Sequence, residues 1–190
     1  MMNNIKKSGI GMLLVGIFLM IISVLLIVKN ADFIFYGKTV DLDEILKNGG
    51  EIPQGSFVTY TCDQPLGSYG KEQELFIFIP VGKEGYYYAI FDENGTMLSA
   101  KISDEKIRNK IDNLGDGEKA NIKITGRVRK LNNEMKMYYL DSLRMKTGFD
   151  RSDYYIDTTD TKTSQIVTSV ITFLIGGLMV FLFIKMKKKR

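Results

Sequence analysis

The chain of 190 residues contains no histidine and only one cysteine, Cys62. A nucleophile activated by histidine, as in Cys–His or Ser–His–Asp sites, is therefore excluded within one chain. A zinc site built from cysteine and histidine is excluded as well. A single cysteine cannot form an intrachain disulfide, although an intermolecular disulfide through Cys62 stays open.

Charged residues are absent from two long apolar runs, one near each end of the sequence. Residues 8–28 and 163–184 contain no Asp, Glu, Lys or Arg. As helices, both runs are long enough to cross a hydrocarbon core about 30 Å thick. The first run is longer than the apolar part of a signal peptide, and no small-x-small cleavage site follows it. The sequence therefore predicts two transmembrane helices, the first an uncleaved anchor.

Basic residues flank both runs on the side of the chain ends. Lys6 and Lys7 precede the first run, and the sequence KMKKKR follows the second. Short basic flanks stay in the cytoplasm, so we expect a multi-pass protein of the cell membrane with both termini cytoplasmic. The basic tail would be attracted to the anionic inner leaflet. The predicted organisation is a cytoplasmic N-terminus and first helix (1–29), an extracytoplasmic β-rich domain (30–162), and a second helix with a basic tail (163–190).

All acidic residues lie between the two runs, where they outnumber the basic ones. The basic charge of the whole chain thus reflects membrane topology. We therefore expect no nucleic-acid partner for the central domain.

The first half of the middle segment predicts a short helix and then strands. Residues 40–50 predict a helix capped by Asp41. Residues 57–62 alternate like a strand that buries Val58, Tyr60 and Cys62. Residues 63–74, rich in turn-forming residues, predict a loop. Residues 74–81 predict a strand with apolar residues on both of its faces, as in a strand that is covered on each side.

The second half predicts a hairpin, a helix and two further strands. Residues 86–102 form a hairpin signature around Asn94-Gly95. A helix is expected from Ser103, its N-cap, to Gly115. Residues 119–131 alternate like a strand with a bulge or bend at Gly126. Asn132-Asn133 then predicts a turn into a last strand at 134–143. The expected fold is two transmembrane α-helices flanking a mainly β domain, an OB-like small barrel of about five or six strands with a capping helix.

The strand ANIKITGRVRKL with its central glycine, following a capping helix, resembles OB-like domains of bacterial membrane-anchored proteins of unknown function. The layout of an outer β domain between two membrane helices is also similar to membrane-embedded ubiquitin ligases of mitochondria. Their RING zinc module is absent here, so the resemblance implies an architecture and no ligase activity.

Few residues in the sequence suggest a catalytic or metal-binding role. Cys62 lies on an apolar strand face, where a free cysteine is usually a small core side chain. The carboxylate groups at residues 41–44, 112–118 and 150–160 lack calcium-loop spacing; the last of these segments resembles a solvated linker near the membrane. We therefore expect no metal, no cofactor and no catalytic residue.

Tyrosines and nearby basic residues are the most suggestive surface feature. An OB-like barrel can present aromatic side chains to a ligand or partner, although such rings also fill the interior of small barrels. The candidate ligand or partner surface consists of Tyr69, Lys71, Tyr87, Arg127, Arg129 and Tyr138.

Small residues form rows on the two apolar runs and predict helix-packing faces, within the chain or in a homo-oligomer. These residues are Gly9, Gly16 and Ser23 in the first run and Thr168, Thr172 and Gly176 in the second.

The hypothesis favoured by the sequence is a non-enzymatic, membrane-anchored cell-envelope protein of bacteria whose outer domain binds a ligand or a protein partner. Two alternatives stay open. One is an accessory subunit of a membrane complex. The other is an envelope enzyme that uses paired acidic residues on glycans, for which two carboxylates in one cleft and a raised pKa on one of them would be the sign.

Overall fold

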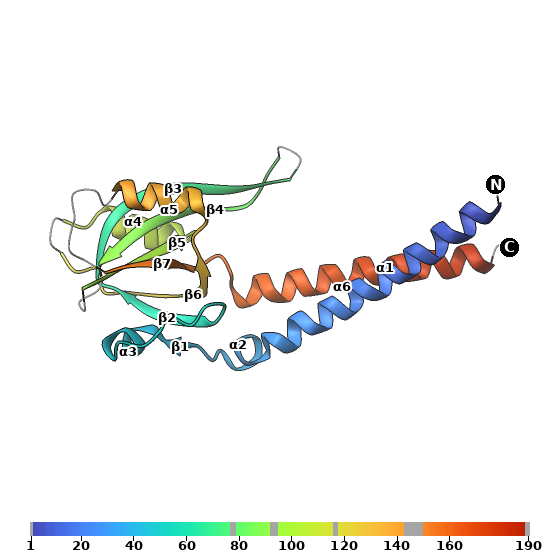
Figure 1. The fold of residues 1–190 in the computed structure, drawn as a ribbon, viewed down its shortest axis with the longest axis horizontal. Coiled ribbons are helices and arrows are strands. Elements are labelled where there is room, and N and C mark those ends of the chain that lie inside the picture. The colour runs from blue at the N-terminus through green and yellow to red at the C-terminus, as the bar shows by residue number, and fades with distance from the viewer. Residues whose placement is uncertain (1, 77–78, 92–94, 116–117, 143–149, 189–190) are drawn as a thin grey trace. The chain divides into compact units, whose positions relative to one another are not determined.

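The computed structural model describes the chain except for residues 1, 77–78, 92–94, 116–117, 143–149 and 189–190. For residues 2–9, 73–76, 79–83, 142 and 150–151 it describes the backbone only. The chain folds into two compact units, one helical and one rich in strands (Figure 1). The helical unit comprises Met1–Gly37 and Thr161–Arg190, and the β unit comprises Lys38–Asp160.

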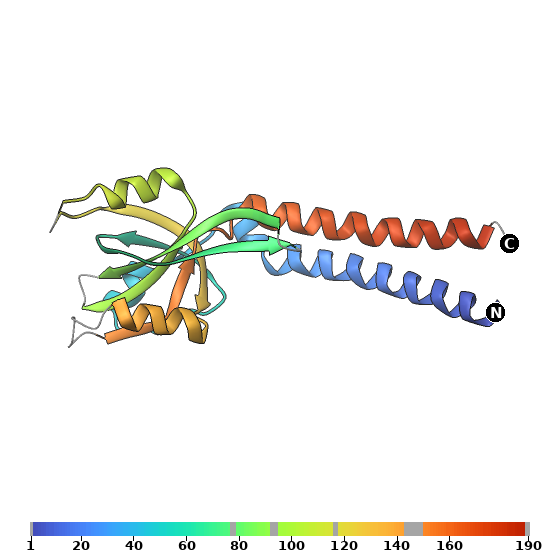
Figure 2. The ribbon, with the colours of Figure 1, turned by 90° about the horizontal axis from the view of Figure 1, so that it is seen from above.

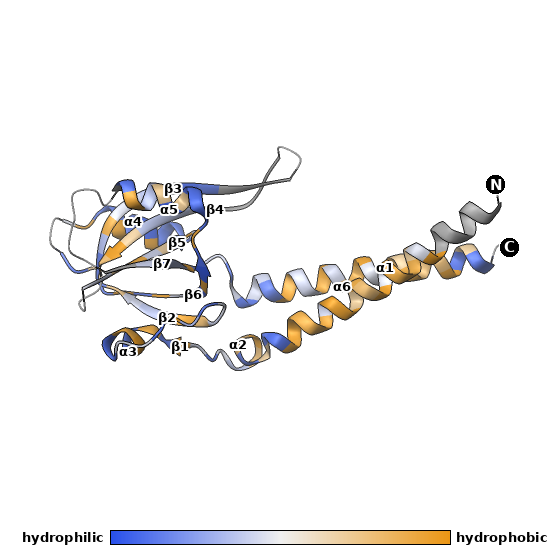
Figure 3. Ribbon diagram, in the orientation of Figure 1, coloured by the Kyte–Doolittle hydropathy of each residue, from blue (hydrophilic) through white to orange (hydrophobic). Residues whose placement is uncertain are grey.

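The helical unit contains the two apolar runs of the sequence. Helices α1 (Met2–Lys29) and α6 (Lys162–Lys188) lie side by side and antiparallel, and the short α2 (Ala31–Tyr36) follows α1 (Figures 1 and 2). Apolar residues dominate both long helices (Figure 3), and many face outward: Leu14, Phe18 and Leu174 are 61%, 62% and 63% exposed. By length and composition, Ile10–Lys29 and Lys162–Lys188 are each sufficient to cross a membrane.

Small residues bring α1 and α6 close together at two levels. A Cβ added to Gly16 would lie 2.8 Å from the carbonyl oxygen of Gly176. Seven residues along each helix, Ser23 Oγ donates a hydrogen bond of 2.7 Å to the carbonyl oxygen of Ser169. Both serines are buried. The contacts repeat at the interval expected of left-handed helix packing.

The rows of small residues identified in the sequence fall partly on this interface. Gly16, Ser23 and Gly176 lie in it. Thr168 is exposed, and Thr172 donates its hydroxyl to the Thr168 carbonyl oxygen of its own helix. Gly9 lies in the part of α1 that is described by its backbone only. Ser169 takes the place next to Ser23, because the contacts recur every seven residues and not every four.

In its described residues, the β unit forms one mixed sheet of seven strands. The strands in chain order are β1 (Val40–Asp41), β2 (Phe57–Cys62), β3 (Gln64–Phe76), β4 (Ile79–Phe91), β5 (Thr96–Ile102), β6 (Ile122–Lys130) and β7 (Asp150–Asp157). Their order across the sheet is β1-β2-β6-β7-β5-β4-β3. The pairs β1–β2 and β5–β7 are parallel, and the other neighbours are antiparallel.

The prediction of a mainly β domain in a chain with two long apolar helices is confirmed. The expected small barrel is not: the sheet has seven strands instead of about five or six, and it is open. Among the described residues, no pairing joins the edge strands β1 and β3.

The main hydrophobic core lies on one face of the sheet. Val58, Tyr60 and Cys62 of β2 are completely buried in it, as their alternation predicts. Two helices cover this core, α3 (Leu42–Lys47) through Leu42 and α4 (Glu105–Asp112) through Ile111.

Side-chain caps set where these two helices begin. The carboxylate of Asp41 accepts a hydrogen bond from the backbone N–H of Glu44, so the predicted cap of α3 is confirmed. Helix α4 begins one residue later than predicted. Asp104, and not Ser103, is the N-cap, and its carboxylate accepts from the N–H groups of Lys106 and Ile107.

A second hydrophobic cluster lies on the other face, under α5 (Asn133–Ser142). Tyr87 and Tyr88 are neighbours on β4 and therefore point to opposite faces. Tyr88 belongs to the main core and Tyr87 to the second cluster. Helix α5 contributes Met135 and Tyr139, which are buried four residues apart on one side of the helix.

Helix α5 corrects the prediction of a last strand at residues 134–143. The side-chain oxygen of Asn132 accepts a hydrogen bond of 2.7 Å from the Met135 N–H, so Asn132 starts a helix and not a turn between strands. The adjacent tyrosines Tyr138 and Tyr139 suggested strand alternation, but packing of Met135 and Tyr139 on the sheet favours the helix.

Strand β7 corrects the prediction of a solvated linker at residues 150–160. It is an internal strand between β5 and β6. Its Asp157 is buried, and an ion pair of 3.0 Å with Arg129 of β6 compensates the loss of hydration. The acidic sequence therefore did not indicate a strand, because its charges are paired only within the folded sheet.

Strands β3 and β4 correct two further predictions. Residues 64–76, expected as mostly loop, form the long strand β3, with irregular pairing around Ser68 and Glu72. Residues 74–81, expected as one covered strand, belong to both strands of a hairpin in which Phe76 pairs with Ile79. The turn residues of the sequence are thus accommodated by irregularities within a strand.

Gly126 is not a bulge in the pairing of β2 with β6, whose register is unbroken from Phe57 to Cys62. A Cβ at Gly126 would lie 2.5 Å from the carbonyl oxygen of Asp157. Glycine is required there because the end of β7 passes close to the backbone of β6.

Candidate functional site

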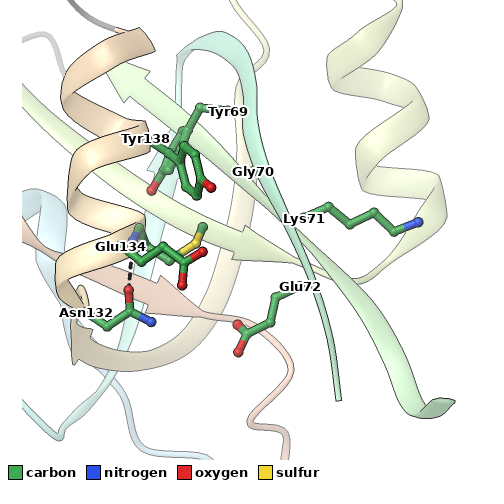
Figure 4. A pocket seen from close by; sticks show the side chains of 8 residues that line it. Tyr69, Gly70, Lys71, Glu72, Asn132, Glu134 and Tyr138 are labelled. Atoms are coloured by element: carbon green, nitrogen blue, oxygen red, sulfur yellow. Dashed lines mark hydrogen bonds between the residues drawn. The ribbon is translucent and has the colours of Figure 1, made fainter. Parts of the chain in front are cut away.

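A pocket of about 480 Å³ lies between β3 and α5 on the outer side of the second hydrophobic cluster (Figure 4). The residues that line it, hereafter the β3–α5 pocket, are Tyr69, Gly70, Lys71, Glu72, Asn132, Glu134, Met135 and Tyr138. Three of the six surface residues predicted from the sequence are among them: Tyr69, Lys71 and Tyr138.

The close approach of α5 to β3 forms the floor of the pocket. The Met135 side chain packs on Gly70, where a Cβ would lie 2.7 Å from the Met135 Cε. Tyr69 and Tyr139 pack with their ring centroids 5.2 Å apart, and the Tyr69 hydroxyl is hydrogen-bonded to Ser99 Oγ on β5. Burial raises the pKa of Tyr69 above its ordinary range. Tyr69 is therefore a fixed, neutral wall of the pocket.

The Glu72 side chain, on one side of the pocket, is held in place by a hydrogen bond and an ion pair to residues of the sheet. The Tyr87 hydroxyl donates a hydrogen bond of 2.5 Å to Glu72 Oε2, and Lys101 Nζ lies 3.0 Å from the same oxygen. Lys101 reaches it from β5 by crossing Gly85, where a Cβ would collide with the lysine stem at 2.2 Å. The Tyr87 hydrogen bond and then Lys101 hold the pKa of Glu72 below its ordinary value, against the opposing effect of partial burial. Glu72 is thus held in its ionised form.

Tyr87 supports the pocket from below and does not line it. Its side chain is 2% exposed and belongs to the second cluster, with its ring 5.3 Å from that of Tyr155. Burial and the hydrogen bond to ionised Glu72 raise the pKa of Tyr87. The hydroxyl therefore keeps its proton and remains a donor to Glu72.

The pocket is acidic because the lysine at its rim, Lys71, points out of the pocket and pairs with another residue. Lys71 points away from the other lining side chains (Figure 4), and its Nζ lies 2.9 Å from Glu84. The carboxylates of Glu72 and Glu134 lie on the pocket itself (Figure 4). Glu134 is exposed and has no ion pair within the described part of the chain.

Arg127 and Arg129 do not reach the pocket and serve a different site on β6. Arg127 Nε and Arg129 Nη2 each lie 3.0 Å from Asp160 Oδ2, and Arg129 Nε pairs with Asp157. Both aspartates are buried. These two arginines therefore fix the last residues of the β unit, and their charges are compensated by carboxylates.

The acidic lining residues Glu72 and Glu134 were missed in the sequence, as were Asn132 and Met135. A helix that starts at Asn132 would have placed Glu134 and Tyr138 four residues apart on one helix face. Glu72 offered no such signal, since its position depends on β3 being a strand where the sequence suggests a loop.

The described residues offer no catalytic thiol or metal centre. Burial, together with the charge of Asp63, raises the pKa of Cys62 to about 12, and the side chain is completely buried. No group of three or more Asp, Glu or Cys side chains in the described residues is placed to hold a metal ion.

Comparison with protein-family models, curated proteins and solved structures gives no significant match for this chain. The site must therefore be interpreted from its own geometry.

Proposed function

We propose that this chain is a membrane-anchored, non-enzymatic protein of the bacterial cell envelope. In this proposal α1 and α6 span the membrane with both termini in the cytoplasm, and the β unit lies outside and binds a protein partner. The outward-facing apolar side chains of the helix pair support the anchoring, since a water-exposed helix would leave this surface unprotected. The basic residues at both chain ends support the orientation.

The observation that carries the binding proposal is a carboxylate that has no cation partner among the described residues and lies beside an exposed aromatic ring in the β3–α5 pocket. Glu134 faces the pocket without a cation partner in the described residues, and Tyr138 on the same helix is 49% exposed. A carboxylate next to a tyrosine ring attracts an ammonium or guanidinium group by charge and by cation–π interaction. The pocket therefore fits a lysine or arginine side chain of a partner.

The surroundings of the pocket favour a polypeptide over a small molecule. Met137 and Leu140 of α5 are 67% and 36% exposed, and with Tyr138 they extend an apolar surface beyond the pocket. Exposed methionine and tyrosine are common at protein-binding surfaces. A partner would cover this surface while its basic side chain enters the pocket.

The alternative of glycan hydrolysis fits the pocket less well. Glu72 and Glu134 share one pocket, which is the arrangement that such an enzyme needs. However, the pKa of Glu72 is lowered by the Tyr87 hydrogen bond and by Lys101. A general acid requires a raised pKa, so the environment of Glu72 favours binding over proton donation.

The test is a titration of the full-length protein in lipid nanodiscs, followed by NMR of ¹³C-labelled methionine methyl groups. The probe is the capped peptide Gly-Lys-Gly, and the control peptide carries norleucine instead of lysine. Met135 lines the pocket and should shift in a saturable way with the lysine peptide only. Met97 is completely buried and should not shift.

Two variants make the result specific. Glu134→Gln removes the charge with little change in shape and should abolish the Met135 shift, whereas Glu105→Gln on exposed α4 should leave it unchanged. Equal shifts with both peptides, or a lysine-dependent shift that survives Glu134→Gln, would refute the cation-binding pocket.

A further inference from the structure

Strand β3 lies at the edge of the described sheet and carries opposite charges on its two faces. Among the described strands, β3 pairs with β4 only, and Lys71 and Glu72 are in register with that strand. Neighbouring side chains of a strand point to opposite faces, and Figure 4 shows Lys71 and Glu72 on different sides of β3. Glu72 lies on the face covered by α5, and Lys71 lies on the face covered by α4.

A second cation, Arg108 of α4, lies on the same face as Lys71. Its guanidinium carbon is 4.1 Å from the centroid of the Tyr86 ring, and Lys71 Nζ is 5.4 Å from the same centroid. Tyr86 is also the residue of β4 that pairs with Lys71. The tyrosine ring therefore holds the guanidinium of Arg108 beside the edge strand, on the face opposite the β3–α5 pocket.

Arg108 has no acceptor for its N–H groups within the part of the chain that the structure describes. Its Nε is buried without a hydrogen bond, and no described carboxylate lies within ion-pair distance of it. Glu84 pairs instead with Lys71 at 2.9 Å. Asp112 accepts a hydrogen bond of 3.1 Å from the Tyr88 hydroxyl. Because a buried donor without an acceptor is unfavourable, Arg108 is suited to an acceptor from a binding partner.

Stacking on Tyr86 also orients Arg108 for a carboxylate. The ring covers one flat side of the guanidinium, whereas the N–H donors lie around its edge. A carboxylate accepts two such N–H groups in a bidentate hydrogen bond. This face of β3 therefore fits an acidic side chain, and the other face fits the basic side chain proposed above.

We propose that the partner binds β3 through an extended segment in which a basic and an acidic residue are adjacent. The segment adds a strand to the edge of β3, since an edge strand presents backbone N–H and C=O groups for such pairing. Its basic side chain enters the β3–α5 pocket. Its neighbouring acidic side chain reaches Arg108 on the other face, because adjacent residues of a strand point to opposite faces. This inference rests on the proposed binding of a basic side chain in the pocket.

A second copy of the chain fits this edge less well than a segment of another protein. If two copies of β3 pair antiparallel about a two-fold axis perpendicular to the sheet, both Lys71 side chains lie on one face and like charges come together. Tyr69 is an extra residue between the paired positions of Ser68 and Gly70. Such a bulge twists the edge and disfavours pairing of two identical edges.

Two NMR signals of the full-length protein in lipid nanodiscs report the two faces separately. The ¹³C methyl group of Met135 reports the pocket, and the ¹⁵Nε–Hε group of Arg108, assigned by its loss in Arg108→Gln, reports the other face. The capped peptides Gly-Lys-Glu-Gly and Gly-Glu-Lys-Gly are titrated, because an added strand can run in either direction. The control Gly-Lys-Gln-Gly lacks the acid. The control Gly-Lys-Gly-Glu-Gly places both charges on the same face of an extended chain.

The proposal predicts that at least one peptide with adjacent charges shifts both signals with one dissociation constant, about tenfold lower than that of Gly-Lys-Gln-Gly. The two control peptides should shift Met135 alone. Arg108→Gln should remove the tenfold advantage, whereas Lys110→Gln on the exposed side of the same helix should retain it. An unchanged Met135 response of Arg108→Gln to Gly-Lys-Gln-Gly shows that this variant is folded.

Three results would overturn the proposal at different levels. If the peptides with adjacent charges shift Met135 but neither shifts Arg108, the acidic contact is wrong and the proposed pocket stands. If Gly-Lys-Gly-Glu-Gly shifts both signals with equal affinity, the added strand is wrong. If no lysine peptide shifts Met135, the pocket proposal itself fails, and this inference fails with it.

Discussion

Gly16 of α1 and Gly176 of α6 allow the backbones of the two helices to touch. A Cβ on Gly16 would lie 2.8 Å from the Gly176 carbonyl oxygen, and a Cβ on Gly176 would lie 2.6 Å from the Gly16 carbonyl oxygen. The contact is reciprocal and involves backbone atoms, so a side chain on either residue must push the helices apart.

Alanine at either position should therefore separate α1 from α6. We expect Gly16→Ala and Gly176→Ala to lengthen the distance between spin labels on the outward positions Phe18 and Leu174 by about 1–2 Å, because interaxial distance follows the size of the contact residues. Double electron–electron resonance on the full-length protein in nanodiscs measures this distance. Cys62 is buried and should not take up label.

Neighbouring glycines provide matched controls for the helix contact. A Cβ on Gly11 or Gly177 would meet no atom within 4 Å outside its own helix backbone and adjacent residues. Gly11→Ala and Gly177→Ala should leave the distance unchanged. Equal lengthening in all four variants would show that the effect comes from helix propensity and not from the contact.

Gly126→Ala should destabilise the β unit more than an ordinary glycine substitution. The added Cβ would lie 2.5 Å from the Asp157 carbonyl oxygen, and the strand backbone there cannot move aside as a flexible side chain would. We expect a loss of about 1–3 kcal/mol in the free energy of unfolding, as is typical of overpacking. Urea unfolding monitored by reaction of Cys62 with a maleimide measures the loss.

Gly115→Ala is the comparison for Gly126→Ala. A Cβ there would have no contact closer than 3.4 Å. If Gly115→Ala were as destabilising as Gly126→Ala, the close approach of β7 to β6 would not be the cause.

Several features of the β unit were accessible from sequence, and they are the local ones. Alternation of Val58, Tyr60 and Cys62 predicted a strand because the periodicity lies within a few residues. Asp41 predicted a helix start for the same reason. In contrast, β7 and much of β3 depend on distant partners: the charges of β7 are acceptable in a sheet only because Arg129 pairs with Asp157.

The candidate site shows the same division between local and distant signals. Three of the predicted surface residues do meet at one pocket, which lies where β3 and α5 are neighbours. They are Tyr69, Lys71 and Tyr138. The direction of Lys71 was not predictable, since it depends on Glu84 of the neighbouring strand. The acidic character of the pocket therefore emerged only from the fold.

Glu72→Gln should weaken the β unit at neutral pH by leaving Lys101, 6% exposed, without its carboxylate. Because Glu72 is 45% exposed at its side chain and partly screened by water, we expect a modest loss of about 1 kcal/mol. The folded pKa of Glu72 is below its ordinary value, so the stabilisation is present above the unfolded pKa of about 4.3 and is lost as the pH falls through the folded pKa.

The difference in unfolding free energy between wild type and Glu72→Gln should accordingly be constant near neutral pH and shrink below about pH 4. Glu84→Gln, which breaks an exposed pair with Lys71, should cost less. A difference that grows on acidification would contradict the assigned role of Glu72.

Cys62 should be inert in the folded protein. Burial and Asp63 raise its pKa to about 12, so at neutral pH it is a buried thiol and not a thiolate. We expect maleimide modification of the full-length protein only when urea unfolds the β unit. Lys110→Cys on the exposed side of α4 is the positive control. Rapid modification of Cys62 without denaturant would reopen a reactive or intermolecular role for this thiol.

The most direct test of the account is the side of the membrane on which each part of the chain lies. Intact bacterial cells that express Lys110→Cys or Lys187→Cys are treated with a maleimide that cannot cross membranes; wild type, with only buried Cys62, gives the background. The account predicts modification of Lys110→Cys in intact cells and of Lys187→Cys only after the membrane is opened. Modification of Lys187→Cys in intact cells, or of Lys110→Cys only after opening, would contradict it.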